Sequence, residues 1–170
     1  MRHQDAITAL ARMPETLQSR LKGLSDEQLR VKPAHDVFSV LESVCHLRDI
    51  EVEGYGRRLG LLLREDHPRL PDVDGTTLAR ERHYNDQELR PALDAFLNMR
   101  RRCLEILASV TPEQLERRGY FDNVGEVTLA GLLDLWVEHD RGHVQELDAL
   151  LPLLQAPQTG QPKPSRSLTT

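Results

Sequence analysis

The chain has 170 residues, of which 39% are hydrophobic and 29% charged, with a net charge of −5 at pH 7. This balance fits one soluble globular domain with a sizeable core, and the negative charge disfavours nucleic-acid binding, which usually needs a basic surface. No apolar run approaches membrane-spanning length, and the N-terminus lacks the apolar core of a signal peptide. Cys45 and Cys103 both lie in apolar helical patterns, so we expect reduced, buried thiols in a cytoplasmic protein.

Four stretches of apolar residues at helical spacing follow one another along the chain. They predict helices at about residues 4–22, 39–64, 86–109 and 128–151. Ser39 and Glu42 form a capping-box pattern at the start of the second helix, and Pro152 limits the end of the fourth. No window shows strand alternation with hairpin turns. The fold class predicted is therefore all-α, a four-helix bundle with long interhelix connections that spans residues 1–154.

Two segments outside the predicted helices differ in character. Residues 65–85 form a long connection in which Leu70 and Val73 give the chain something to bury. Long connections in compact domains are usually functional or disordered, and we expect this one to pack over an end of the bundle. Residues 155–170 are rich in Pro, Gln, Ser and Thr, so we expect a flexible C-terminal tail.

The fourth predicted helix carries His139 and His143 in the stretch WVEHDRGH. At about 100° per residue the two rings lie about 40° apart on one helix face, at the edge of the apolar stripe. A shared metal ion explains two inward-pointing imidazoles, because neutral imidazole ligates zinc, nickel, iron and copper. The alternative is two core histidines, each hydrogen-bonded to a neighbour. We expect Trp136 to be part of the core beneath them.

The second predicted helix holds one histidine, His46, in the stretch VCHLRDIE. Glu42, Asp49 and Glu53 lie within about 60° of it around the helix, while most apolar residues lie on the other side. This geometry favours a surface histidine among carboxylates. It also favours Glu42 as a capping residue over Glu42 as a catalytic base.

Two charged residues fall inside the apolar stripes. Asp140 lies in the apolar arc of the fourth predicted helix. Arg48 lies near the centre of the apolar arc of the second predicted helix. A charge in a core stripe must be paired or reach solvent. We predict that both side chains face the interior and that each finds an opposite charge, with each other as one option. The alternative is that both side chains extend past the apolar stripe, so that their charged groups reach solvent.

Three stretches of the chain resemble the DinB/YfiT-like superfamily of proposed metalloenzymes, which are four-helix bundles. They are FSVLESVCHLRDIE at residues 38–51, LPDVDG at residues 70–75 and TLAGLLDLWVEHDRGHVQEL at residues 128–147. The metal triad of that superfamily is one histidine on the second helix and an HxxxH pair on the fourth. The resemblance therefore implies that His46, His139 and His143 bind one divalent metal ion. We expect zinc or nickel, although imidazole ligands do not decide between them.

Three neutral histidines leave coordination positions open, which is typical of a catalytic site. The resemblance implies a metal-dependent hydrolase or a low-molecular-weight-thiol S-transferase that acts on a small-molecule substrate. Candidate proton carriers are Glu42, Asp49 and Glu53, and the alternative for these carboxylates is a solvated face or support of the metal ligand. A non-catalytic metal-binding or stress-response protein remains an alternative, as does a bundle whose histidines only pack. Dimers occur in the superfamily, so a homodimer is compatible with the resemblance, although no interface is identified.

Overall fold

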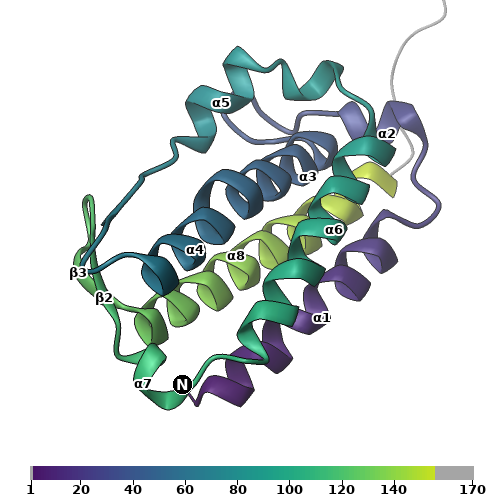
Figure 1. Cartoon of the computed structure of the whole chain (residues 1–170). Coiled ribbons are helices and arrows are strands. Elements are labelled where there is room, and N and C mark those ends of the chain that lie inside the picture. Colours follow the sequence, from purple (N-terminus) through teal and green to yellow (C-terminus); the bar gives the residue numbers. More distant parts are fainter. Residues whose placement is uncertain (1, 156–170) are drawn as a thin grey trace, which may run out of the picture.

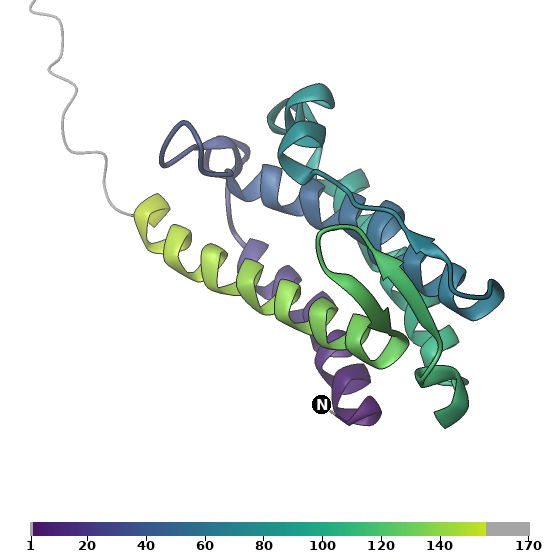
Figure 2. The same ribbon diagram turned by 90° about the vertical axis from the view of Figure 1, so that its left-hand side faces the viewer.

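The computed structural model describes residues 2–155, so the predicted flexible tail lies outside the described residues from residue 156 onward. Four long helical segments form a bundle (Figures 1 and 2). In chain order they are α1 (His3–Leu21), α3 (Val40–Asp49) continued by η1 (Ile50–Tyr55) and α4 (Gly56–Arg64), α6 (Leu89–Leu107) and α8 (Leu129–Gln155). Because α1 and α3 each pack against both α6 and α8, the predicted four-helix bundle is the observed architecture.

A local sequence signal sets the start of α3, whereas another fails at the end of α8. Ser39 Oγ accepts the N–H of Glu42 at 3.1 Å, and Glu42 Oε2 accepts the N–H of Ser39 at 2.8 Å, so the predicted capping box is confirmed. The predicted stop at Pro152 is wrong, because α8 continues to Gln155. Proline at this position removes only the hydrogen bond to the carbonyl of Asp148, a residue on the exposed side of the helix.

Shorter elements join the long helices. They are α2 (Asp26–Arg30), β1 (Arg69–Leu70), α5 (Gly75–Glu81), the 3₁₀ segment η2 (Tyr84–Asp86), α7 (Pro112–Leu115), β2 (Arg118–Phe121) and β3 (Gly125–Thr128). The strands form a sheet in the order β1-β2-β3, with β1 parallel to β2 and β2 antiparallel to β3. The sequence analysis predicted no strand, and this small sheet is the main departure from the expected architecture.

The connection at residues 65–85 is ordered throughout. Leu70 is fully buried, and Val73 packs against the core, as expected. Its helices α5 and η2 lie against α3, so the segment runs from the sheet along the side of the bundle instead of only covering one end (Figure 1). This course brings the segment close to the helix that carries His46.

The apolar core has two clusters that meet at a layer of buried charge. One cluster gathers around Trp136, and the other around Phe96. Arg100 on α6 and Asp140 on α8 each lie between members of the two clusters on their own helix. Among the described helices, none is both long and apolar enough to cross a membrane.

The charges predicted inside the apolar stripes both find partners, but not each other. Asp140 is buried and pairs with Arg100, with 2.6 Å between Oδ2 and Nη1, so the prediction for Asp140 is confirmed. Arg48 is half-buried and pairs with Asp49 at 2.6 Å. A helical wheel places a residue on a face, but it does not say which neighbouring helix supplies the partner.

Candidate metal centre

Three histidines from two helices converge on one point. His46 comes from α3, and His139 and His143 come from α8, with their ligand nitrogens all within 4.8 Å of one another. Nε2 of His46 lies 3.4 Å from Nε2 of His139. Two nitrogens bound at about 2.0–2.1 Å in tetrahedral geometry are separated by about 3.3–3.4 Å, so this pair already has the spacing of ligands to one ion.

The position of His46 differs from the surface position that its helical wheel favoured. The acidic stripe beside it is covered by the segment that contains α5 and η2. Asp49 of that stripe accepts hydrogen bonds from Arg82 at 2.8 Å and from the Tyr84 hydroxyl at 2.5 Å. The ring of His46 therefore lies inside the molecule, between α3, α5 and α8, and is half-buried.

Neighbouring side chains orient the two histidines of α8. Nδ1 of His143 lies 2.8 Å from Oε2 of Glu146, which leaves its Nε2 for the centre of the site. The ring of His139 meets Tyr55 edge-on, with 5.4 Å between the ring centroids. Tyr55 stacks on Trp136, which is fully buried, so Trp136 is part of the core beneath the site as predicted.

The electrostatic environment keeps the rings of His46 and His143 in the form that binds metal. Burial, followed by repulsion from His143 and His139, lowers the pKa of His46 to about 3. Burial and the neighbouring His139 also lower the pKa of His143. Near pH 7 both rings are neutral, and neutral imidazole is the ligand form.

The donor set fits a divalent transition metal. Three imidazole nitrogens suit zinc, nickel, copper or iron, and they leave positions for further ligands. Within residues 2–155, this is the one group of three or more His, Cys, Asp or Glu side chains whose ligand atoms converge closely enough for a single ion.

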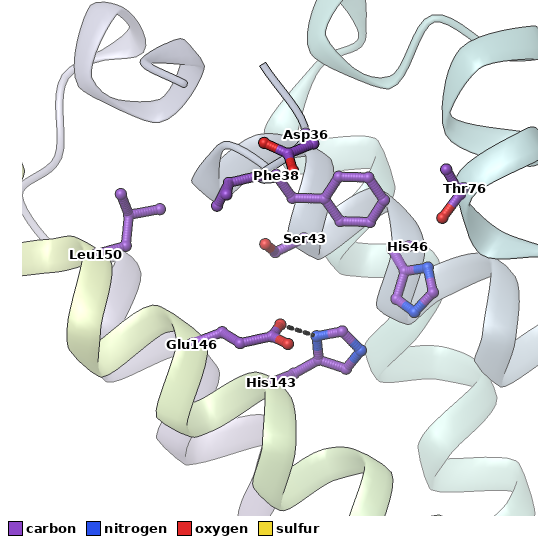
Figure 3. Close-up of a pocket in the computed structure, with 9 residues that line it drawn as sticks. Asp36, Phe38, Ser43, His46, Thr76, His143, Glu146 and Leu150 are labelled. Carbon is purple, nitrogen blue, oxygen red and sulfur yellow. Dashed lines mark hydrogen bonds and ion pairs between the residues drawn. The ribbon is translucent and has the colours of Figure 1, made fainter. Parts of the chain in front are cut away.

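A cavity of about 510 Å³ opens beside the histidines (Figure 3). It is bounded by two of the three rings, by apolar side chains and by short polar ones. The lining residues are Asp36, Val37, Phe38, Ser43, His46, Thr76, His143, Glu146 and Leu150. The arrangement provides a pocket in which a small molecule would contact both the histidines and an apolar wall.

Glu42, a predicted proton carrier, has its carboxylate oxygens engaged by other groups. They accept hydrogen bonds from Lys32 Nζ at 2.8 and 2.9 Å and from the N–H of Ser39. Glu42 lines a neighbouring cavity together with Lys32, and it is absent from the lining of the cavity beside the histidines. These contacts favour the capping role, and a catalytic role for Glu42 stays a prediction.

Asp49 and Glu53 hold the covering segment. Besides Arg82 and Tyr84, Asp49 pairs with Arg48 at 2.6 Å, and Glu53 pairs with Arg82 at 2.5 Å. Their carboxylates are thus partnered on the side of α5 and η2. A catalytic role for Asp49 also stays a prediction, and its contacts favour an anchoring role.

Glu146 is the site residue that the sequence analysis missed. It lies three residues after His143, a spacing at which helical side chains meet, so the signal was present in the sequence. A histidine and a carboxylate three residues apart on a helix also pair without any metal, so the spacing alone does not indicate a site.

The chain is similar to known proteins of one family. The chain matches the DinB superfamily over residues 9–147. It is 24% identical over 145 residues to a Bacillus subtilis protein named "Putative metal-dependent hydrolase YfiT". That alignment covers 85% of this chain and 81% of the Bacillus protein. It is 22% identical over 144 residues to an Oceanobacillus iheyensis protein that is also named as a "Putative metal-dependent hydrolase". That alignment covers 85% of this chain and 83% of the Oceanobacillus protein.

A solved structure supports the fold. The structure of YfiT from Bacillus subtilis, described as having "an unusual four-helix bundle topology", superposes with a TM-score of 0.82 and 22% sequence identity. The match covers 90% of this chain and 87% of that chain. This likeness shows that the two proteins share their bundle fold.

Proposed function

We propose that this chain, which belongs to the DinB superfamily, is a metal-dependent hydrolase whose metal ligands are His46, His139 and His143. The observation that carries the proposal is the convergence of the three ligand nitrogens within 4.8 Å, beside an open cavity. Curated relatives named as metal-dependent hydrolases support it. The ion proposed is zinc or nickel, and the compartment proposed is the cytoplasm.

Several residues around the proposed site have separate roles. A bound divalent ion would supply Lewis acidity and lower the pKa of a coordinated water. Glu146 holds the ring of His143 with its Nε2 toward the centre. Ser43 and Thr76 line the cavity with hydroxyl groups that are able to hydrogen-bond a polar substrate group, while Phe38 offers an apolar wall.

Away from the bound ion, the side chains that line the cavity disfavour an anionic substrate group. Among the described residues that line it, two are carboxylates, Asp36 and Glu146, and none is lysine or arginine. A low-molecular-weight thiol that carries carboxylates would therefore meet like charge there. We propose a small substrate that is uncharged or cationic and has an apolar part.

The test is a turnover assay on protein purified without a histidine tag and loaded with zinc or nickel. A panel of uncharged and cationic esters and amides should be hydrolysed, and His143→Ala should abolish the reaction. His3→Ala, which removes a histidine at the start of α1, outside the cluster, should keep it. Consumption of a thiol and an electrophile without hydrolysis would replace the proposal by an S-transferase. A metal-loaded protein that does neither is a non-catalytic metal-binding protein.

A further inference from the structure

No hydrogen bond from outside the histidine cluster orients the ring of His46 within residues 2–155. Its Nε2 faces His139, and its Nδ1 is buried with no hydrogen-bond partner within residues 2–155. Histidines that bind metals usually donate their second ring N–H to a carboxylate or carbonyl, which fixes the direction of the ring. His143 follows this rule through Glu146, but His46 does not. Packing must therefore set the direction of the His46 ring.

Gly75, the first residue of α5, is buried against this ring. A Cβ atom added to Gly75 would lie 2.2 Å from both Nδ1 and Cε1 of His46, far inside the 3.0 Å below which real Cβ contacts are essentially never found. Figure 3 shows Thr76, the next residue, on the same side of the cavity as His46. Any side chain at position 75 would thus push away either the histidine ring or α5.

Contacts on both sides hold α5 in place. Before it, Arg58 Nε donates to the carbonyl of Pro71 at 2.9 Å. After it, Arg82 pairs with Asp49 at 2.8 Å and with Glu53 at 2.5 Å. Asp49 and Glu53 lie on the same helical run as His46, so the anchored segment lies over the face that carries the histidine. Moving α5 would break these contacts, whereas the ring of His46 is held by packing and by the 3.4 Å contact of its Nε2 with Nε2 of His139.

We infer that Gly75 is a positioning residue of the metal centre. Because Gly75 lacks a side chain, α5 lies directly on the edge of the His46 ring and keeps Nε2 turned toward His139 and His143. The inference rests on the proposed metal site. It adds that the backbone of the covering segment sets the orientation of one ligand, His46. It also gives Asp49 a structural task, the anchoring of that segment through Arg82.

The experiment compares Gly75→Ala with a matched control, Gly142→Ala. Gly142 precedes a ligand histidine on α8, and a Cβ added there meets nothing within 4 Å. Zinc affinity is measured by competition with a chromophoric chelator, and coordination by the visible absorption of the cobalt(II) form. Gly75→Ala should bind zinc about 10–100-fold more weakly and change the cobalt spectrum, since support of a ligand ring typically has that effect. Gly142→Ala should match the wild type.

A double-mutant cycle on the metal-free protein separates the clash from general destabilisation. Gly75→Ala should lower the urea midpoint in the wild type but not in a His46→Ala background, where the ring is gone. If the single variant does not fold, the double variant should fold with the midpoint of His46→Ala. Equal zinc affinity and an equal cobalt spectrum for the two glycine variants would overturn the inference, as would a double variant that stays as unstable as Gly75→Ala alone. A wild type that binds no zinc or cobalt would contradict the proposed function, while the cycle would still test the contact.

Discussion

Arg100 and Asp140 form a two-pronged ion pair in the centre of the bundle, with Nη1–Oδ2 and Nη2–Oδ1 distances of 2.6 and 3.1 Å. Glu51 engages the other side of the same guanidinium through Nε and Nη2, at 2.7 and 2.8 Å. Arg100 is 1% exposed, so its charge relies on these partners and on the carbonyl of Leu10. The pair joins α6 to the helix that carries two of the three metal ligands.

Asp140→Asn should destabilise the metal-free protein by about 3–5 kcal/mol, because it leaves a buried guanidinium with one charged partner fewer. The free energy of unfolding in urea is the measurement. Arg101→Gln is the control, since Arg101 is 62% exposed and pairs with the exposed Glu105. That substitution should change stability by about 0.5 kcal/mol or less. Equal stability of Asp140→Asn and the wild type would show that the pair does not support the bundle.

Asp49→Asn should lower stability at pH 7 by about 2 kcal/mol, the scale of hydrogen bonds to a charged group. Burial alone would raise the pKa of Asp49, but hydrogen bonds from Arg48 and Tyr84 outweigh it and leave the pKa below its usual value. A carboxyl group with a lowered pKa stabilises the fold above its unfolded pKa of about 3.9, and the contribution disappears as pH falls through the folded pKa. The cost of the substitution should therefore fade below about pH 4.

The same variant distinguishes anchoring from catalysis. An anchoring Asp49 predicts lower stability together with weaker metal binding, because the covering segment loosens. A catalytic Asp49 predicts lost turnover with unchanged metal affinity and unchanged unfolding. Asp148→Asn, which breaks a partly exposed ion pair with Arg20, is the control for loss of a surface carboxylate.

The metal-free protein should lose stability as the pH falls below about 6.5, the usual pKa of histidine. The pKa of His46 is lowered to about 3 by burial and by its histidine neighbours, so the unfolded chain takes up a proton there before the folded chain does. Between those two values the folded state is progressively disfavoured as protons are added. His46→Gln should show a smaller loss of urea midpoint between pH 7 and pH 5 than the wild type. A loss of the same size in both proteins would argue against a buried, neutral His46.

Glu146→Gln should weaken zinc binding about 10–100-fold, the usual effect of removing the partner of a ligand histidine. The carboxylate lies 2.8 Å from Nδ1 of His143, and a neutral amide is a weaker acceptor for that ring N–H. Glu138→Gln is the matched control, because Glu138 is exposed on the same helix and pairs with Arg141. Chelator competition should leave the control unchanged. Equal weakening in both variants would point to a general charge effect, and no weakening in either would leave Glu146 without a supporting role.

Helical periodicity was sufficient to predict the bundle, but it failed where elements were short or irregular. The strands have two or four residues each, and β1 pairs in parallel with a strand about fifty residues later in the chain. Such a pairing leaves no local pattern. Near Asp49 the helix passes into the π segment η1, and a wheel at a constant angle per residue does not hold through it. Glu51, which lies in η1 and binds Arg100, is a buried charge that the sequence analysis did not single out.

The histidine pair of the candidate site was visible in the sequence, but its surroundings were not. The four-residue spacing of His139 and His143 predicted one shared face. His46 lies beside carboxylates on its helix, and only the tertiary packing of α5 shows that this face is covered. Contacts such as that of Gly75 with His46 depend on where a distant segment packs. Hydrophobic periodicity within one helix carries no information about that position.

The metal content of the purified protein tests the central claim most directly. Protein made without a histidine tag is reconstituted with zinc or nickel, freed of unbound metal by gel filtration, and analysed for metal and protein. One ion per chain is expected for the wild type and for His3→Ala, and substantially less for His46→Ala, His139→Ala and His143→Ala. A folded wild type that retains no metal, or that retains as much as the three ligand variants, would contradict a metal centre at His46, His139 and His143.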